Sequence, residues 1–227
     1  MLNGLLSLPA CGIIISIVCY GIGVQIRKRV PSPVTNPLII ANVLVILIIL
    51  LTPLTLEQYM AGGTMITMFI VPVTVILALR IYRQRALFRA NAIPILAGCA
   101  AGSVASVSSV LLLCRVFSID QIITVSMLPK SVTTAVALEL AEKNGGIPGI
   151  AATAVIVTGV FSAAFSPFFI KLFRLKDPVA AGVACGASGH AIGTAAALEM
   201  GEIQGAMGGI AISLMGIVTS VIFLFLF

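Results

Sequence analysis

The sequence contains very little charge for its length. Only 9% of its 227 residues are Asp, Glu, Lys or Arg, whereas a soluble domain carries about a quarter. No hydrophilic stretch is long enough to fold as a separate soluble domain. Apolar residues make up 60% of the chain, and apolar segments of about 20 residues, the length that spans a bilayer, recur along it. The composition therefore predicts a single membrane domain.

Residues that support catalysis or metal binding are also scarce. The chain has one histidine, His190, and its five cysteines are scattered without a CxxC motif or a Cys/His cluster of metal-binding spacing. We interpret the cysteines as small buried hydrophobes. Two aspartates and no recognisable nucleophile–base pair argue against an enzyme. We expect no metal and no cofactor.

The basic residues give the chain a formal net charge of +6. They do not form a nucleic-acid-binding patch, because they lie in short clusters beside apolar segments, at 27–29, 80–89 and 171–176. Basic clusters that flank membrane spans mark the cytoplasmic side. We expect a lipid bilayer around the chain and no nucleic-acid partner.

Hydropathy predicts an all-α integral membrane protein with about six full spans and two interrupted segments. The full spans are expected near 5–24, 34–55, 61–80, 91–114, 147–170 and 205–227. The segments 119–142 and 178–202 are broken near their middles by Gly, Pro or a charge. All three basic clusters fall on one side only if 119–142 enters and leaves on the same side, as a re-entrant hairpin. A full but broken span is the alternative.

An internal repeat appears when the chain is compared with itself at an offset of 60 residues. KSVTTAVALELAEKNGGIPGIA from Lys130 aligns without gaps with HAIGTAAALEMGEIQGAMGGIA from His190, and four of the five glutamates fall at equivalent positions. A hairpin followed by one crossing makes the second unit enter from the opposite face, so an inverted repeat is expected. Within one domain, 1–227, we predict a scaffold or dimerisation part at 1–114 and repeat units at 119–170 and 178–227.

The two breaks suggest an anion site. The second arms of the hairpins are expected as half-helices from Ser131 to Glu142 and from Ala191 to Glu202. Twelve residues rise about 18 Å, roughly half the hydrocarbon thickness. Each half-helix would then begin near mid-membrane, where its unpaired N–H groups favour an anion.

The side chains at these half-helix starts fit a carboxylate. Lys130 and His190 occupy equivalent positions and supply positive charge, although a shallow lysine that reaches water and a structural histidine are the alternatives. Hydroxyls donate hydrogen bonds, and glycines let the backbone approach a ligand. The predicted substrate-binding residues are Lys130, Ser131, Thr133, Thr134, Ser188, Gly189, His190, Gly193 and Thr194. Glu139 and Glu199 are candidates for proton coupling, with packing or a surface ion pair as the alternative.

Four stretches resemble the LrgB/CidB family: LPKSVTTAVALE at 128–139, NGGIPGIAA at 144–152, GHAIGTAAALE at 189–199 and NPLIIANVLV from Asn36. That family includes bacterial holin/antiholin-like membrane proteins and the plastid glycolate/glycerate translocator. The chain departs from the common pattern at Ala135, Gly189 and Ala196, where the family commonly has Pro, Ser and Arg. Without that Arg, a bidentate clamp for a carboxylate is missing.

The resemblance implies a multi-pass protein of the bacterial cytoplasmic (inner) membrane with a small LrgA/CidA-like membrane partner. It also implies either export of small hydroxy- or keto-acids or control of murein hydrolase activity and lysis. Together with the helix breaks, it favours a secondary transporter of a small monocarboxylate such as glycolate, glycerate, lactate or pyruvate, with its coupling ion left open. The alternative is a holin/antiholin-like regulator. We expect a homodimer.

Overall fold

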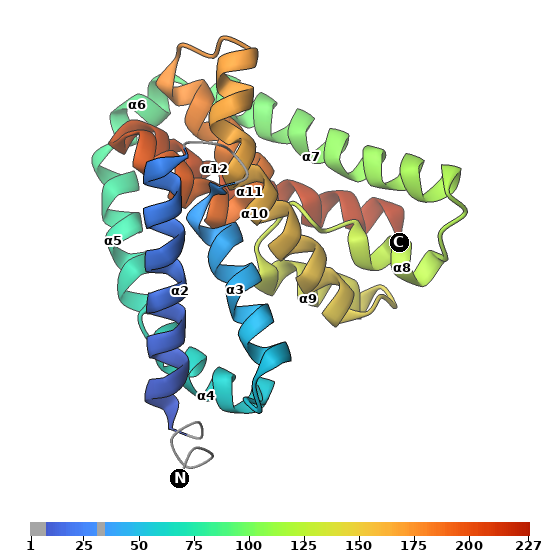
Figure 1. Cartoon of the computed structure of the whole chain (residues 1–227). Helices are drawn as coiled ribbons and strands as arrows, with labels where there is room; N and C mark the ends of the chain where they lie inside the picture. The colour runs from blue at the N-terminus through green and yellow to red at the C-terminus, as the bar shows by residue number, and fades with distance from the viewer. Residues whose placement is uncertain (1–7, 31–34) are drawn as a thin grey trace. The chain divides into compact units, whose positions relative to one another are not determined.

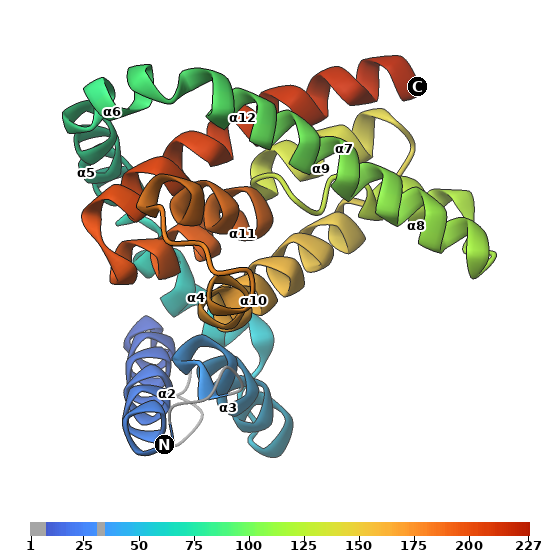
Figure 2. The same ribbon diagram turned by 90° about the horizontal axis from the view of Figure 1, so that it is seen from above.

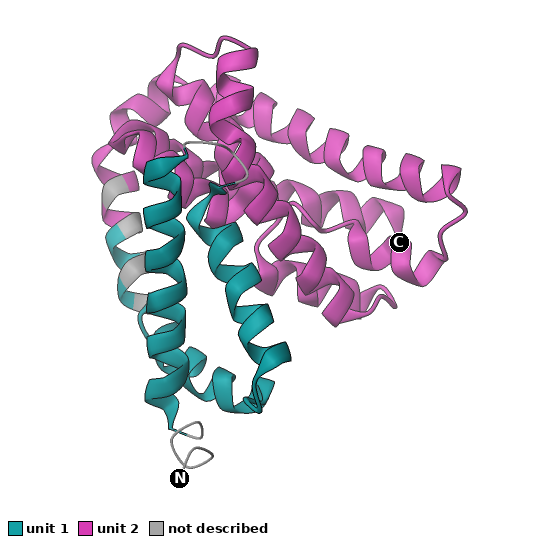
Figure 3. Cartoon of the chain, viewed as in Figure 1, with its two compact units in different colours: residues 1–76 teal, residues 77–227 magenta. Residues whose placement is uncertain are grey.

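The computed structural model describes residues 8–30 and 35–227, leaving aside the side chains of residues 70, 71, 73, 74, 77 and 80. The described residues form helices and no strands. They divide into two compact units, Met1–Ile76 and Leu77–Phe227, which are coloured separately in Figure 3. The helix α5 (Ile70–Arg83) contains the boundary between residues 76 and 77.

Unit 1 contains α2 (Pro9–Arg29), α3 (Pro37–Leu51) and α4 (Leu56–Thr67), and α2 contacts both of the others. The helix starts follow from the sequence, since Asn36 accepts a hydrogen bond from the amide of Leu38 and Pro37 takes the first helical position. Thr55 and Gln58 form a capping box at the start of α4. The hydroxyls of Ser16 and Tyr59 are 2.8 Å apart and join α2 to α4.

The predicted span at 61–80 is divided in the structure. The helix α4 ends at Thr67 and α5 begins at Ile70, so residues 68 and 69 interrupt the run. Pro72 explains the break, because it has no N–H to donate to the carbonyl of Met68 and its ring crowds that carbonyl. The expectation of one continuous helix over 61–80 was therefore wrong.

Unit 2 contains seven helices within the described residues, apart from the end of α5 (Figure 1). They are α6 (Arg85–Ala90), α7 (Ala92–Val116), α8 (Gln121–Met127), α9 (Thr134–Lys143), α10 (Pro148–Leu172), α11 (Pro178–Met200) and α12 (Glu202–Leu226). The helix α11 packs against α7, α10 and α12, while α8 and α9 contact α10. Figures 1 and 2 both show α8 and α9 beside one end of α10.

Polar side chains cap the starts of two of these helices, α8 and α11. Asp120 accepts a hydrogen bond from the amide of Ile122 at the start of α8, and Asp177 accepts from two amides at the start of α11. The buried Ser126 hydroxyl donates to the carbonyl of Ile122 and accepts from the amide of Ile147. One hydroxyl thus ties the short helix α8 to the segment that leads into α10.

Five of the described helices are long and apolar enough to cross a membrane: α2, α7, α10, α11 and α12. The helix α3 is apolar but has only 15 residues. The all-helical membrane class is confirmed. The expected bounds also hold closely for 91–114 and 147–170, where the structure has Ala92–Val116 and Pro148–Leu172.

The tightest packing in unit 2 lies between α11 and α12. A Cβ atom built on Gly182 or Gly186 would overlap the backbone carbonyl oxygens of Gln204 and Gly208. These two helices therefore meet backbone to backbone, as small residues permit in membrane bundles. Larger residues on the neighbouring faces close a core between α7, α11 and α12, which includes Ile95, Met207 and Met215.

A methyl group at residue 186 should disturb this contact. Backbone atoms of Gly208 cannot move aside by a rotamer change, so Gly186→Ala is expected to cost about 1–3 kcal/mol and to lower the melting temperature in detergent by about 2–12 °C. Gly216→Ala is the matched control, since a Cβ there meets nothing within 4 Å. Equal melting temperatures for the two variants would contradict the observed packing.

Candidate functional site

The first break separates α8 from α9. Residues 128–133 leave the helical path, with turn hydrogen bonds from the amides of Lys130 and Val132 to the carbonyls of Met127 and Pro129. Pro129 lacks the N–H that a continuing helix needs. Leu128 and Val132 are almost completely buried, so they anchor the turn while the side chain of Lys130 remains half-buried. The break was predicted at this place, but α9 starts at Thr134 rather than at Ser131.

The second break is a single residue within α11. His190 has φ 40° and ψ −129°, whereas the residues on either side are helical. A positive φ is unfavourable for a residue with a Cβ and persists only where its surroundings hold it. The side chain of His190 is 2% exposed, and its ring lies against Gly159 of α10, where a Cβ would come within 2.8 Å of Cε1. The helix ends at Met200, two residues before the expected end at Glu202.

The two breaks meet. His190 Nε2 donates a hydrogen bond of 3.2 Å to the backbone carbonyl of Lys130. That carbonyl lies in the non-helical turn, where it has no regular helical partner, so the histidine satisfies it. Lys130 and His190 are also the residues that the 60-residue offset aligns. Equivalent positions of the repeat are therefore in direct contact.

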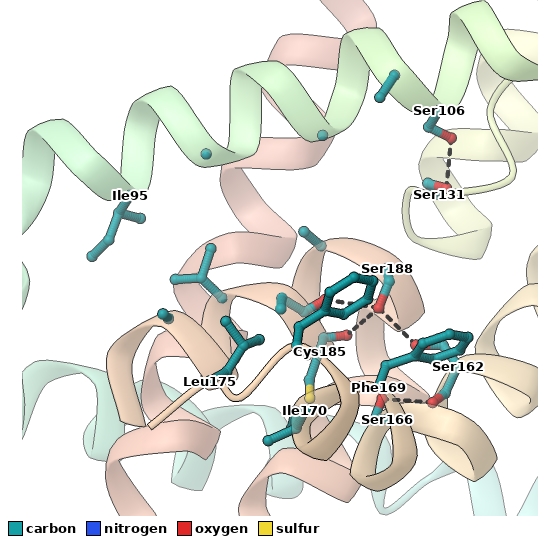
Figure 4. Close-up of a pocket in the computed structure, with 18 of the residues that line it drawn as sticks. Ile95, Ser106, Ser131, Ser162, Ser166, Phe169, Ile170, Leu175, Cys185 and Ser188 are labelled. Atoms are coloured by element: carbon teal, nitrogen blue, oxygen red, sulfur yellow. Dashed lines mark hydrogen bonds between the residues drawn. The ribbon is translucent and has the colours of Figure 1, made fainter. Parts of the chain in front are cut away.

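A cavity of about 1100 Å³ lies beside these breaks, between α7, the turn at 128–133, α10 and α11. It is at the upper end of the size range of ligand pockets. Most of its lining is apolar, and Figure 4 shows hydroxyl groups on several of the surrounding elements. Its polar lining residues are Asn91, Ser106, Ser109, Lys130, Ser131, Thr158, Ser162, Ser166, Asp177 and Ser188.

Hydrogen bonds organise the hydroxyls of the cavity into two groups. Ser106 of α7 and Ser131 of the turn are 2.8 Å apart, and the ammonium of Lys130 donates to Ser131 Oγ at 3.3 Å. On the other wall, the hydroxyls of Ser162 in α10 and Ser188 in α11 are 2.7 Å apart. Lys130 is the one basic side chain among the lining residues that the structure describes, and none of the described carboxylates lies at ion-pair distance from it.

The structure separates the predicted site residues into those that line the cavity and those that do not. Lys130, Ser131 and Ser188 line it. His190, Gly189, Gly193 and Thr194 are buried in the packing of α11, and Thr133 and Thr134 lie at the start of α9; none of these six is among the lining residues. The hydroxyl of Thr194 is buried, and within the described residues it has no hydrogen-bond partner. Such a group is costly unless something pairs with it.

The glutamates proposed for proton coupling lie outside the cavity. Glu139 is exposed and forms an ion pair of 2.6 Å with Lys143, one turn further along α9. An adjacent ammonium favours the ionised carboxylate, which matches the alternative of a surface ion pair. Glu199 is also exposed. Proton coupling through either residue stays a prediction.

Sequence reasoning missed the serines on the helices that face the breaks. Ser106, Ser162 and Ser166 supply much of the polar lining, and they stand in spans that are otherwise apolar. The available signal was their spacing, since Ser103, Ser106 and Ser109 recur every three residues and Ser162 and Ser166 are one turn apart. Hydroxyls repeated at helical spacing in a span mark a face that contacts protein rather than lipid.

The five long apolar helices and the polar breaks define a multi-pass helical membrane protein. The chain belongs to the LrgB-like family, whose model matches residues 16–227, as the resemblance had implied. Relatives named "Antiholin-like protein LrgB" from Bacillus cereus (strain B4264) and Bacillus anthracis (strain A0248) are each 39% identical over 215 residues, which is 94% of this chain and 94% of theirs. None of these names points to an enzyme. No solved structure matches the chain.

The strained backbone at residue 190 makes a specific prediction. In a regular helix Ala is more stable than Gly by about 1 kcal/mol, but a positive φ reverses the order because Gly has no Cβ. His190→Gly and His190→Ala both remove the hydrogen bond to Lys130. The difference between their melting temperatures therefore reports the effect of the backbone conformation at residue 190 alone. We expect the Gly variant to melt several degrees above the Ala variant in detergent.

Ala187→Gly serves as the control for this comparison, because residue 187 has ordinary helical geometry in the same helix. There the wild-type Ala should be the more stable residue. If Ala were the more stable residue at position 190 as well, the left-handed conformation assigned to His190 would be incorrect.

Proposed function

We propose that the chain acts in the bacterial cytoplasmic membrane as an antiholin-like protein. The observation that carries this proposal is the match to relatives of that name along nearly the whole of both chains. The family resemblance implies that such a protein controls murein hydrolase activity and lysis, together with a small LrgA/CidA-like membrane partner. An antiholin-like protein restrains lysis, so its loss should release hydrolase activity.

Deletion of the gene from its bacterial host tests this role. Cells without the protein are expected to lyse faster in mild detergent and to show higher murein hydrolase activity on a gel that contains cell walls. Expression of the wild-type chain from a plasmid should restore the slow lysis. Unchanged lysis and unchanged hydrolase activity in the deletion strain would contradict an antiholin-like role.

A second candidate function is a carrier for a small monocarboxylate, and the placement of Lys130 favours it. An ionisable side chain at membrane depth costs about 2.5–3.5 kcal/mol on insertion scales, so it usually marks a ligand or ion site. Here Lys130 lines a cavity, and its ammonium has a hydroxyl rather than a carboxylate as its neighbour, so it is available to an anion. A pore that only leaks does not need this arrangement.

The carrier proposal includes a topology. We propose that 119–142 is re-entrant, that 119–170 and 178–227 are inverted repeats, and that 1–114 serves as scaffold or dimerisation part of a homodimer. Support comes from the contact between Lys130 and His190, because two units related by a two-fold axis meet at equivalent residues near that axis. The buried hydroxyl of Thr194 adds a donor near the second break.

Flux into proteoliposomes tests the carrier function. The wild-type protein should show saturable uptake of labelled lactate or glycolate, and Lys130→Gln should reduce it at least tenfold, because loss of a charge-assisted hydrogen bond removes about 1.5–3 kcal/mol. Lys143→Gln is the control, since that lysine is exposed on α9 and lies outside the cavity. Flux that does not saturate, or that both variants keep unchanged, would contradict a carrier with Lys130 in its site.

A further inference from the structure

Most hydroxyls of the cavity lie at one end, whereas the other end is mainly apolar and holds two polar residues, Asn91 and Asp177. Figure 4 shows Ser106, Ser131, Ser162 and Ser188 towards one side, while Ile95 and Leu175 lie towards the opposite side. The polar end also holds Lys130, whose ammonium contacts Ser131. A ligand that matches this lining has one anionic group and an apolar body.

The apolar end is built from three segments. Pro94 belongs to α7, Leu175 to the segment between α10 and α11, and Val183 and Ala187 to α11. Ile95 and Val179 also line this end, but most of their surface is covered by the core between α7, α11 and α12. The carboxylate of Asp177 also lines the cavity, but it is engaged with the amides of Val179 and Ala180 as a helix cap. Asp177 therefore repels a second negative charge without disturbing an apolar tail.

The length of the cavity argues against a ligand of only two or three carbons. Ile95 and Ser106 are eleven residues apart on the same helix, which corresponds to about 16 Å along its axis. Glycolate or lactate at the lysine would leave the apolar end without a contact. Apolar surface that stays uncovered contributes nothing to affinity.

We propose that this cavity binds a free amphipathic monocarboxylate, whose head contacts Lys130, Ser131 and Ser106 and whose alkyl or aromatic body extends along α7 towards Ile95 and Val183. The proposal rests on the carrier function above and defines its substrate class. The single ammonium of Lys130 favours ligands with one carboxylate over those with two. The apolar end favours ligands with a longer alkyl or aromatic body. Each added methylene should tighten binding roughly three- to fourfold until the body fills the cavity.

Equilibrium binding to the full-length protein in phosphatidylcholine nanodiscs measures this dependence. The probes are labelled lactate, butyrate, hexanoate and octanoate, with nanodiscs without protein to subtract partition into lipid. We expect affinity to rise from butyrate to octanoate by at least tenfold, and Lys130→Gln to lose the saturable part for every probe. An affinity that does not change with chain length overturns the proposal.

A larger side chain at Gly98 should fill part of the apolar end of the cavity and leave the end with Lys130 unchanged. It lines the cavity on α7, and a Cβ built there meets nothing within 4 Å, so a larger side chain is accommodated without a clash. Gly98→Leu should lower the ratio of octanoate to butyrate affinity at least tenfold. Gly216→Leu is the matched control, because it also has open space but lies on α12 outside the cavity, and it should keep the wild-type ratio.

Three results distinguish this proposal from the carrier function itself. Saturable binding of lactate with no gain from longer chains overturns the amphipathic substrate and leaves the carrier. No saturable binding of any probe overturns both. Nanodiscs that contain phosphatidylglycerol distinguish a lipid from a free acid: displacement of octanoate by this lipid would make the cavity a lipid site and overturn the proposal.

Discussion

Every helix break in a membrane leaves backbone N–H and C=O groups that lipid cannot satisfy, and this chain meets that constraint by letting one break satisfy the other. The carbonyl of Lys130 is exposed by the turn between α8 and α9, and the ring of His190 donates to it. His190 in turn keeps a conformation that its Cβ disfavours, and the surrounding helices hold it there. This hydrogen bond fixes the turn that carries Lys130 beside the cavity.

The hydrogen bond to Lys130 gives His190 a structural contact that the sequence did not predict. As a residue at a glycine-rich break it suggested a ligand contact, and in the structure its buried ring donates a hydrogen bond to a backbone carbonyl. Lys130 is then the one basic side chain among the lining residues described. In the proposed carrier, the hydroxyls of Ser106, Ser131, Ser162 and Ser188 would take the place of the Arg that the family commonly has where this chain has Ala196. Hydroxyls donate without the desolvation cost of a second charge.

The sequence was sufficient for the features that depend on local chemistry. Pro129 and the glycines around His190 located both breaks, and hydropathy placed α7 and α10 within two residues. The sequence was insufficient for contacts that depend on how a helix is rotated about its own axis, because this rotation decides which side chains face the neighbouring elements. The helix α7 carries serines at 103, 106, 108 and 109, and the sequence alone did not indicate that Ser106 rather than Ser109 would meet Ser131. The interruption at Met68 was missed because hydropathy is insensitive to the missing N–H of Pro72.

The backbone contact between α11 and α12 also has a mechanical consequence. Side chains let neighbouring helices adjust by changing rotamers, but at Gly182 and Gly186 there are no side chains to rearrange. The two helices therefore have one close-packed arrangement and behave as a single stiff element. The opposite side of α11 differs, because side chains of α7 and α10 border the cavity there and can change rotamers. The stiff pair thus acts as the fixed wall of the cavity, and its volume is set by the helices across from it.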